Sequence, residues 1–112
     1  MERAPAVYIM TNAFHGTIYT GVTSNLLQRI HQHREGNLDG FTARYDCKRL
    51  VWFEMHGSLE SAIIREKRLK NWPRAWKLAL IEEANPTWRD LTEDLGFNPL
   101  GQRKMDPGSS PG

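Results

Sequence analysis

The sequence predicts a small α/β domain in which helices flank three β-strands. Three runs are rich in β-branched and aromatic residues, and three longer stretches carry the start and stop signals of helices. The chain has 112 residues, of which 39% are hydrophobic and 25% charged, a balance typical of one compact domain with a single core. We therefore expect residues 1–97 to form one domain. Residues 98–112 have too little apolar surface to offset the entropy of ordering, so they are predicted to form a disordered tail.

The first two strands are predicted to form a β-hairpin. Residues 6–11 read AVYIMT, residues 17–22 read TIYTGV, and five residues separate them. Residues 50–55, which read LVWFEM, make the third predicted strand. Residues 37–48 show no clear periodicity and are predicted to be a loop with a short helical turn.

The three helices are predicted at residues 24–35, 58–71 and 73–84. The first helix follows a capping Thr or Ser and stops at a glycine, and the second starts at Ser58. The third has Pro73 in its first turn, where the missing amide donor costs nothing.

An Asn-Pro pair ends the third helix, and the chain after it is predicted to return to the domain through Trp88 and Leu91. Trp72, Trp76 and Trp88 are expected to pack the third helix and its exit, in preference to stacking nucleic-acid bases.

Positive charge is concentrated in one part of the chain. The formal net charge of +2 is small, but six basic residues and one acid lie between Arg65 and Lys77, and the following stretch is acidic. A local basic face suits a phosphate backbone. The side chains expected to bind nucleic acid are Lys67, Lys70, Arg74 and Lys77.

Cys47 is the single cysteine, which excludes an internal disulfide framework. The sequence also shows neither a basic-then-apolar leader nor an apolar run of about 20 residues. These features predict a cytoplasmic protein with no membrane contact.

Glu66 has an unusual position in the second predicted helix. At roughly 100° per residue it falls in the same stripe as Ala62 and Leu69, which should face the protein. A buried carboxylate is costly unless it is paired or bound to a metal. The pattern leaves two interpretations open, a metal ligand and an ion pair with Lys70 or Arg29.

Two pairs of residues could join such a site. Arg29 and His33 lie four residues apart on one face of the first predicted helix, where they could stabilise a phosphoryl oxygen and move a proton. Tyr8 and Tyr19 lie on the two strands of the hairpin, and both face the same side if the numbers of cross-strand partners add to an odd sum. Each residue alone is more often a solvating or packing residue, so only the combination indicates a site.

In combination these residues resemble the GIY-YIG nuclease domain. The likeness covers about residues 6–91 and is closest to small single-domain members, which share runs such as YTGVTSNLLQRI, REKRLK and NPTWRDL. It extends to the nuclease domain of the excision-repair endonuclease. The residues that carry it are Val7-Tyr8, Tyr19-Thr20-Gly21, Arg29, His33 and Glu66.

The resemblance implies a three-stranded antiparallel sheet flanked by helices, and a metal-dependent endonuclease that hydrolyses phosphodiester bonds by in-line attack of water. Glu66 would bind one divalent metal, Mg²⁺ or Mn²⁺, and Arg29 would contact the scissile phosphate. Tyr8 and Tyr19 would orient or deprotonate the water, while His33 fills a position that is His or Tyr in the family. The implied partner is nucleic acid, and DNA is the expected substrate. A role in DNA repair is also expected, and the protein is expected to be a monomer.

The sequence departs from the family pattern in two places. Residues 6–8 read AVY in place of Gly-Ile-Tyr, which keeps the tyrosine and changes only strand packing. The functional asparagine of many members falls at Leu78, with Lys77 or Asn71 as candidate replacements. Two other functions are left open: a non-catalytic nucleic-acid-binding module on the same fold, and a protein-interaction domain in which the tyrosines and Glu66 belong to the core.

Overall fold

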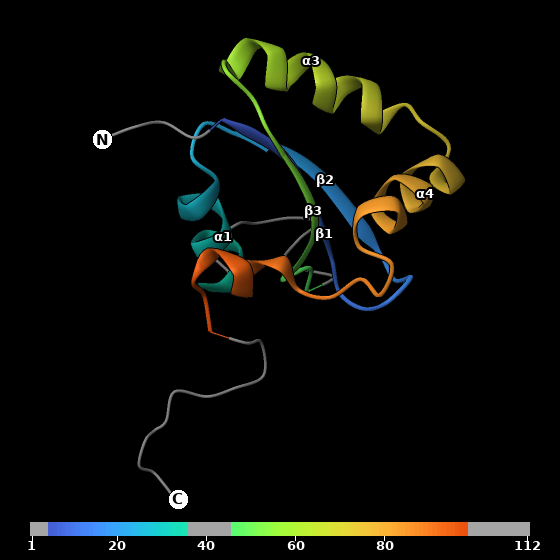
Figure 1. Cartoon of the computed structure of the whole chain (residues 1–112). Helices are drawn as coiled ribbons and strands as arrows, with labels where there is room; N and C mark the ends of the chain where they lie inside the picture. The colour runs from blue at the N-terminus through green and yellow to red at the C-terminus, as the bar shows by residue number, and fades with distance from the viewer. Residues whose placement is uncertain (1–4, 36–45, 99–112) are drawn as a thin grey trace, which may run out of the picture.

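The structure, a computed structural model, describes residues 5–35 and 46–98 (Figure 1). The three predicted strands and three predicted helices are confirmed, with bounds within two residues of those expected. Most of the predicted loop at 37–48, and the tail after Asn98, lie outside the described residues. None of the helices within the described ranges has the length and apolar content needed to span a bilayer. The elements are β1 (Ala6–Thr11), β2 (Ile18–Thr23), α1 (Leu26–Glu35), β3 (Arg49–Met55), α3 (Leu59–Lys70), α4 (Arg74–Ala84) and the 3-10 helix η1 (Leu91–Leu95).

The strands form one antiparallel sheet in the order β2-β1-β3, so β1 is central. All of its residues are buried, because helices cover both faces of the sheet. Tyr8 pairs with Gly21 and Met10 pairs with Tyr19 across the hairpin. The partner numbers add to an odd sum, which places the two tyrosines on the same face of the sheet.

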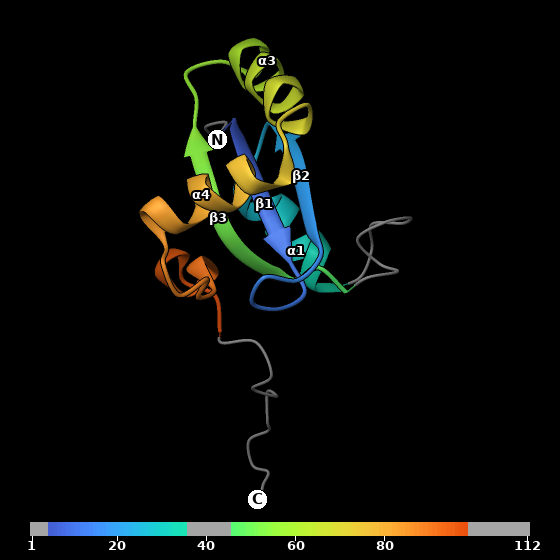
Figure 2. The same cartoon turned by 90° about the vertical axis from the view of Figure 1, so that its right-hand side faces the viewer.

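Side chains alternate along β1 between two cores. Val7 belongs to a core that it shares with Leu69 of α3 and Ile81 of α4. Tyr8 and Met10 point the other way, into a core built with α1. Figures 1 and 2 show the same division: α4 crosses one face of the sheet, α1 and η1 lie on the other, and α3 spans the end of the sheet where β2 finishes.

Local sequence signals set the ends of α3 and α4. The Ser58 side chain caps α3 by accepting a hydrogen bond from the Ser61 amide at 3.1 Å. Asn71 ends α3, and Pro73 occupies the N-cap of α4. The helix therefore begins just after the proline and not at it.

Buried polar groups tie the segment after α4 to the sheet, a role that the sequence pattern did not single out. The Asn85 Nδ2 donates to the Val51 carbonyl at 3.1 Å, and the Asp90 Oδ1 accepts from the Leu50 amide at 3.2 Å. Arg34 of α1 donates to Asp90 from the other side at 3.2 Å. The Arg34 bond holds the start of η1 against α1, and the other two bonds hold the segment against β3.

The tryptophans divide between core and surface. Trp88 is fully buried and Trp72 packs against the same core, as predicted, while Leu91 packs against the other core. Trp76 contradicts the packing prediction, because it is 58% exposed on the outer face of α4. There its ring meets the edge of Trp72, with the centroids 5.7 Å apart.

Candidate active site

Four of the five predicted catalytic residues meet on the α1 face of the sheet. Tyr8 and Tyr19 come from neighbouring strands, and Arg29 and His33 stand one turn apart on α1. The Tyr8 ring centroid lies 6.2 Å from that of Tyr19 and 5.5 Å from that of His33, and the Tyr19 and His33 centroids are 5.7 Å apart. The Arg29 Nη1 donates to the Tyr8 hydroxyl oxygen at 3.3 Å. We call these four residues the tyrosine cluster.

Gly21 makes room for the tyrosine cluster. It lies opposite Tyr8 on β2, and a Cβ at its position would be 2.5 Å from the Tyr8 hydroxyl oxygen and 2.9 Å from Cε2 of Tyr19. A larger residue would therefore push the Tyr8 phenol away from Arg29 and His33. Glycine is required at position 21 because the rings of Tyr8 and Tyr19 pack against it.

His33 is held in its neutral form. The side chain is almost fully buried, and burial together with the Arg29 guanidinium lowers the pKa of His33 to about 4. The backbone of Cys47 acts in the opposite direction but less strongly. At neutral pH the imidazole therefore carries one proton and offers one nitrogen as an acceptor.

Tyr8 keeps its proton. Complete burial raises the pKa of Tyr8 well above its usual value and Tyr19 adds to the shift, while Arg29 opposes it. The Tyr8 oxygen lies 3.2 Å from His33 Nε2. Because Arg29 donates to the same oxygen, the Tyr8 hydroxyl is left to donate its proton to His33 Nε2.

Arg29 is fixed in place and retains hydrogen-bonding capacity. Its Nε donates to Gln32 Oε1 at 3.1 Å, and its Nη1 donates to Tyr8. The described part of the chain offers the remaining N–H groups no acceptor within hydrogen-bonding distance. The guanidinium can therefore bind an oxyanion without losing the contacts that orient it.

Glu66 lies on α3, outside the contacts that define the tyrosine cluster. Its side chain is 10% exposed, which confirms the predicted inward position, and its Oε2 lies 2.5 Å from Lys70 Nζ. Of the two partners considered from the sequence, Lys70 is the one that forms the ion pair. The Lys70 side chain is 52% exposed, so water can replace the carboxylate as its partner.

The donor set at Glu66 suits a hard divalent cation. Within residues 5–35 and 46–98, no three His, Cys, Asp or Glu side chains lie close enough to hold one ion together. Mg²⁺ usually keeps several waters and takes one or two carboxylates, and Mn²⁺ shares its preference for oxygen ligands. A single buried carboxylate whose present counterion is an exposed ammonium fits such an ion, and it does not fit a structural zinc site.

Two of the predicted basic residues, one from α3 and one from α4, line a cleft together with Tyr19. Lys70 and Lys77 line a cleft at the β2 edge of the sheet, and Tyr19 lies in the same cleft together with Ile18 and Thr20. Lys70, the ion-pair partner of Glu66, therefore lines a cleft that Tyr19 also lines.

The other two predicted basic residues differ from each other. Lys67 is exposed on α3 and points to solvent. Arg74 donates its Nη2 to the carbonyls of His15 and Gly16 at 3.2 and 2.8 Å, so it fastens the hairpin turn to α4. Arg74 consequently has a structural role in addition to any contact with phosphate.

The position of the family asparagine is taken by a packing residue. Leu78 packs against the core, and Asn71 caps α3, donating from its Nδ2 to the Lys67 carbonyl at 3.2 Å. Lys77, in contrast, lies beside Tyr19 in the cleft. Of the two candidate replacements, Lys77 is the one that lines a cleft together with a residue of the tyrosine cluster.

Comparison with known proteins identifies relatives and a family. A UPF0213 protein from Syntrophus aciditrophicus is 39% identical over 74 residues, which is 62% of this chain and 80% of that protein. UPF0213 proteins from Staphylococcus haemolyticus, 37% identical over 67 residues (60% of this chain and 82% of that protein), and Aeromonas salmonicida, 28% identical over 88 residues (79% and 63%), are also similar. Among solved structures, none matches this chain. The profile of the GIY-YIG catalytic domain matches residues 4–79, a span that contains the tyrosine cluster and Glu66, and the chain therefore belongs to the GIY-YIG catalytic domain family.

Proposed function

We propose that this protein is a metal-dependent endonuclease that hydrolyses phosphodiester bonds in nucleic acid, with DNA as the expected substrate. The observation that supports it most is the tyrosine cluster, in which two phenols, a guanidinium and an imidazole meet in direct contact. Packing alone does not explain this group, because burying a histidine and partly burying an arginine against a phenol costs free energy of desolvation. Membership of a catalytic domain family supports the same chemistry. We place this activity in the cytoplasm, where the buried thiol of Cys47 stays reduced.

Arg29 is assigned to the scissile phosphate. A guanidinium remains charged at any physiological pH and presents paired N–H groups that match phosphate oxygens. The bonds to Gln32 and Tyr8 fix its plane before substrate arrives. Charge that develops on the phosphate oxygens then meets a donor that needs little reorganisation.

Tyr19 is assigned to the attacking water, and Tyr8 to positioning. Tyr8 is fully buried and its hydroxyl is engaged with Arg29 and His33. Tyr19 is partly exposed and lines the cleft with Lys70 and Lys77. A water that donates to the Tyr19 oxygen would be oriented towards a phosphate held by Arg29, while His33 and Tyr8 keep the guanidinium and the Tyr19 ring in place.

Glu66 is assigned to the divalent metal, Mg²⁺ or Mn²⁺. When bound, such a metal supplies Lewis-acid stabilisation of negative charge on the phosphate and leaving-group oxygens. The contribution of the chain is a carboxylate held at low exposure on a rigid helix, next to a lysine that solvent can hydrate.

The test is a panel of labelled DNA and RNA substrates incubated with Mg²⁺, with Mn²⁺ or with EDTA. Single strands, blunt duplexes, flaps and branched forms would be included. We expect products only with metal, and nicks before double-strand breaks, because one site per chain cuts one strand at a time. Arg29→Ala should lose activity, whereas Arg89→Ala, which removes an exposed arginine paired with Asp94, should keep it. Equal activity in both variants, or no product on any substrate from folded protein, would contradict the proposal.

The second candidate is a nucleic-acid-binding module without turnover. The ion pair between Glu66 and Lys70 favours it, since the carboxylate already has a counterion. Binding that weakens with salt, combined with no cleavage under any metal condition, would select this candidate.

A further inference from the structure

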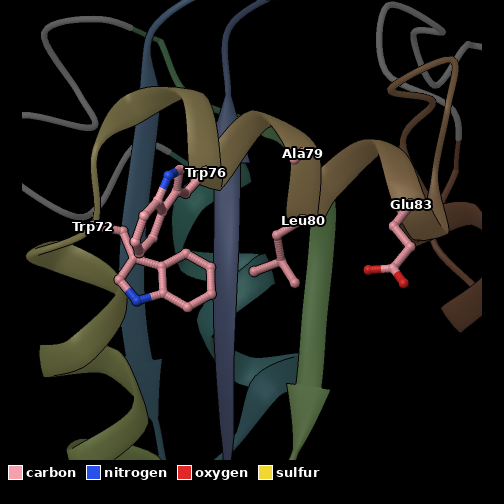
Figure 3. A pocket seen from close by; sticks show the side chains of 5 residues that line it. All are labelled: Trp72, Trp76, Ala79, Leu80 and Glu83. Atoms are coloured by element: carbon pink, nitrogen blue, oxygen red, sulfur yellow. The ribbon is translucent and has the colours of Figure 1, made fainter.

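A second surface has the chemistry to contact nucleic acid and takes no part in the tyrosine cluster. A shallow groove runs along one side of α4 (Figure 3). Figure 3 shows the two tryptophans at the end of α4 nearest α3, and Glu83 at the opposite end. The groove is lined by Trp72, Trp76, Ala79, Leu80 and Glu83.

The exposure of Trp76 has no structural explanation within the fold. Trp72 packs against the core and against the Arg65 guanidinium, whose carbon lies 5.5 Å from its ring centroid. Trp76 is 58% exposed, the largest exposed fraction among the exposed large hydrophobic residues that the structure describes. Its ring meets Trp72 edge to face at an interplanar angle of 76°, which leaves indole surface open to solvent. An exposed indole beside an apolar groove is typical of a ligand-binding surface.

The charge around the groove indicates the kind of ligand. Lys77 follows Trp76 in α4, and Lys70 ends α3 close to Trp72; both lysines line the cleft that contains Tyr19. Two lysines are therefore close in the chain to the indole end of the groove, while Glu83 makes the far end acidic. A nucleic-acid strand whose phosphates lie along Lys70 and Lys77 would be repelled from the far end of the groove by the negative charge of Glu83. A base of that strand would then lie against Trp76.

We infer that Trp76, supported by Trp72, is a stacking platform for an unpaired base of the substrate. The preferred substrates are then single strands, or duplexes that carry an unpaired segment such as a flap. In a continuous duplex each base is stacked between its neighbours, so its face is not available to an indole without an unstacking cost. The inference rests on the proposed function and adds a substrate class to it.

Binding can be measured without cleavage, by fluorescence anisotropy in EDTA. The probes are a labelled single-stranded oligonucleotide and the matched blunt duplex. Trp76→Ala should weaken binding of the single strand by roughly 5- to 150-fold and change duplex binding less than about twofold. Trp76→Phe should restore most of the affinity, because a phenyl ring also stacks. Ile64→Ala is the matched control, since Ile64 is 51% exposed on α3 and does not line the groove.

Three results would overturn the inference. Unchanged single-strand binding in Trp76→Ala would show that the groove does not touch the strand. Equal losses on single strand and duplex would show that Trp76 gives no preference for unpaired bases. Self-association of the wild type in sedimentation, abolished by Trp76→Ala, would assign the groove to a second copy of the chain.

Failure of this inference is distinguishable from failure of the proposed function. Metal-dependent cleavage with no effect of Trp76 on strand preference would remove the stacking platform and keep the nuclease. A strand preference that depends on Trp76, in a protein that cleaves nothing, would keep the platform and remove the nuclease.

Discussion

Replacing Glu66 by glutamine separates a metal ligand from a structural ion pair. The change keeps the shape of the side chain and removes its charge, and it leaves Lys70 without a carboxylate. Because the Lys70 side chain is 52% exposed, water can hydrate its ammonium. Partly exposed pairs at this spacing contribute about 0.3–1 kcal/mol, whereas breaking a fully buried pair costs about 3–5 kcal/mol.

We expect the metal-free stability of Glu66→Gln to lie within about 1 kcal/mol of the wild type, since relief of a buried charge offsets part of the lost pairing. For a domain of this size that corresponds to a change in melting temperature of at most about 4–8 °C. Cleavage in Mg²⁺ should be abolished, and binding of nucleic acid in EDTA should be nearly unchanged.

The assay combines thermal melts in EDTA, the same melts in Mg²⁺, and cleavage with Mg²⁺. A ligand that binds the folded state raises its melting temperature, so Mg²⁺ should stabilise the wild type but not Glu66→Gln. Glu60→Gln is the matched control, because Glu60 is exposed in the first turn of the same helix.

Two results would refute the reasoning. A loss of several kcal/mol in EDTA, with residual cleavage in proportion to the folded fraction, would make Glu66 half of a structural pair. Equal stabilisation of wild type and variant by Mg²⁺ would place the metal elsewhere.

Three further predictions concern other parts of the site. Gly21→Ala puts a Cβ 2.5 Å from the Tyr8 oxygen, so urea denaturation should show a loss of about 1–3 kcal/mol, and cleavage by the folded fraction should fall. The pKa of His33 falls from 6.5 to about 4 on folding, so between these pH values the unfolded chain binds a proton that the folded chain does not. The free energy of unfolding should therefore rise by up to roughly 3 kcal/mol as the pH increases from about 4 to 6.5. His33→Gln should remove this rise. Lys77→Ala should lower the affinity for nucleic acid of any sequence alike, and the slope of log affinity against log salt concentration should decrease by about 1. Arg74→Ala should have the same effect and should also lower the melting temperature, because its bonds to the hairpin turn are lost.

Local structure and the identity of most candidate site residues were predictable from the sequence. The cap at Ser58 and the proline that precedes α4 act through neighbours a few residues away, so their effects can be read along the chain. The shared face of Tyr8 and Tyr19 depends only on whether the pairing sum is odd or even. The inward position of Glu66 follows from helical periodicity alone.

The chemistry of the site was decided by tertiary contacts. His33 is neutral because a fold that joins residues 25 positions apart buries it against Tyr8 and beside Arg29. The need for glycine at position 21 arises from two tyrosine rings that pack against it. The counterion of Glu66 is Lys70, one of the two that the sequence left open. The tryptophans show the same division: sequence predicts that an indole should be buried, but Trp76 is 58% exposed and meets only the Trp72 ring among the aromatic rings of the described residues. Burial and charge pairing depend on which distant atoms fill the space around a side chain, and only the folded chain determines that.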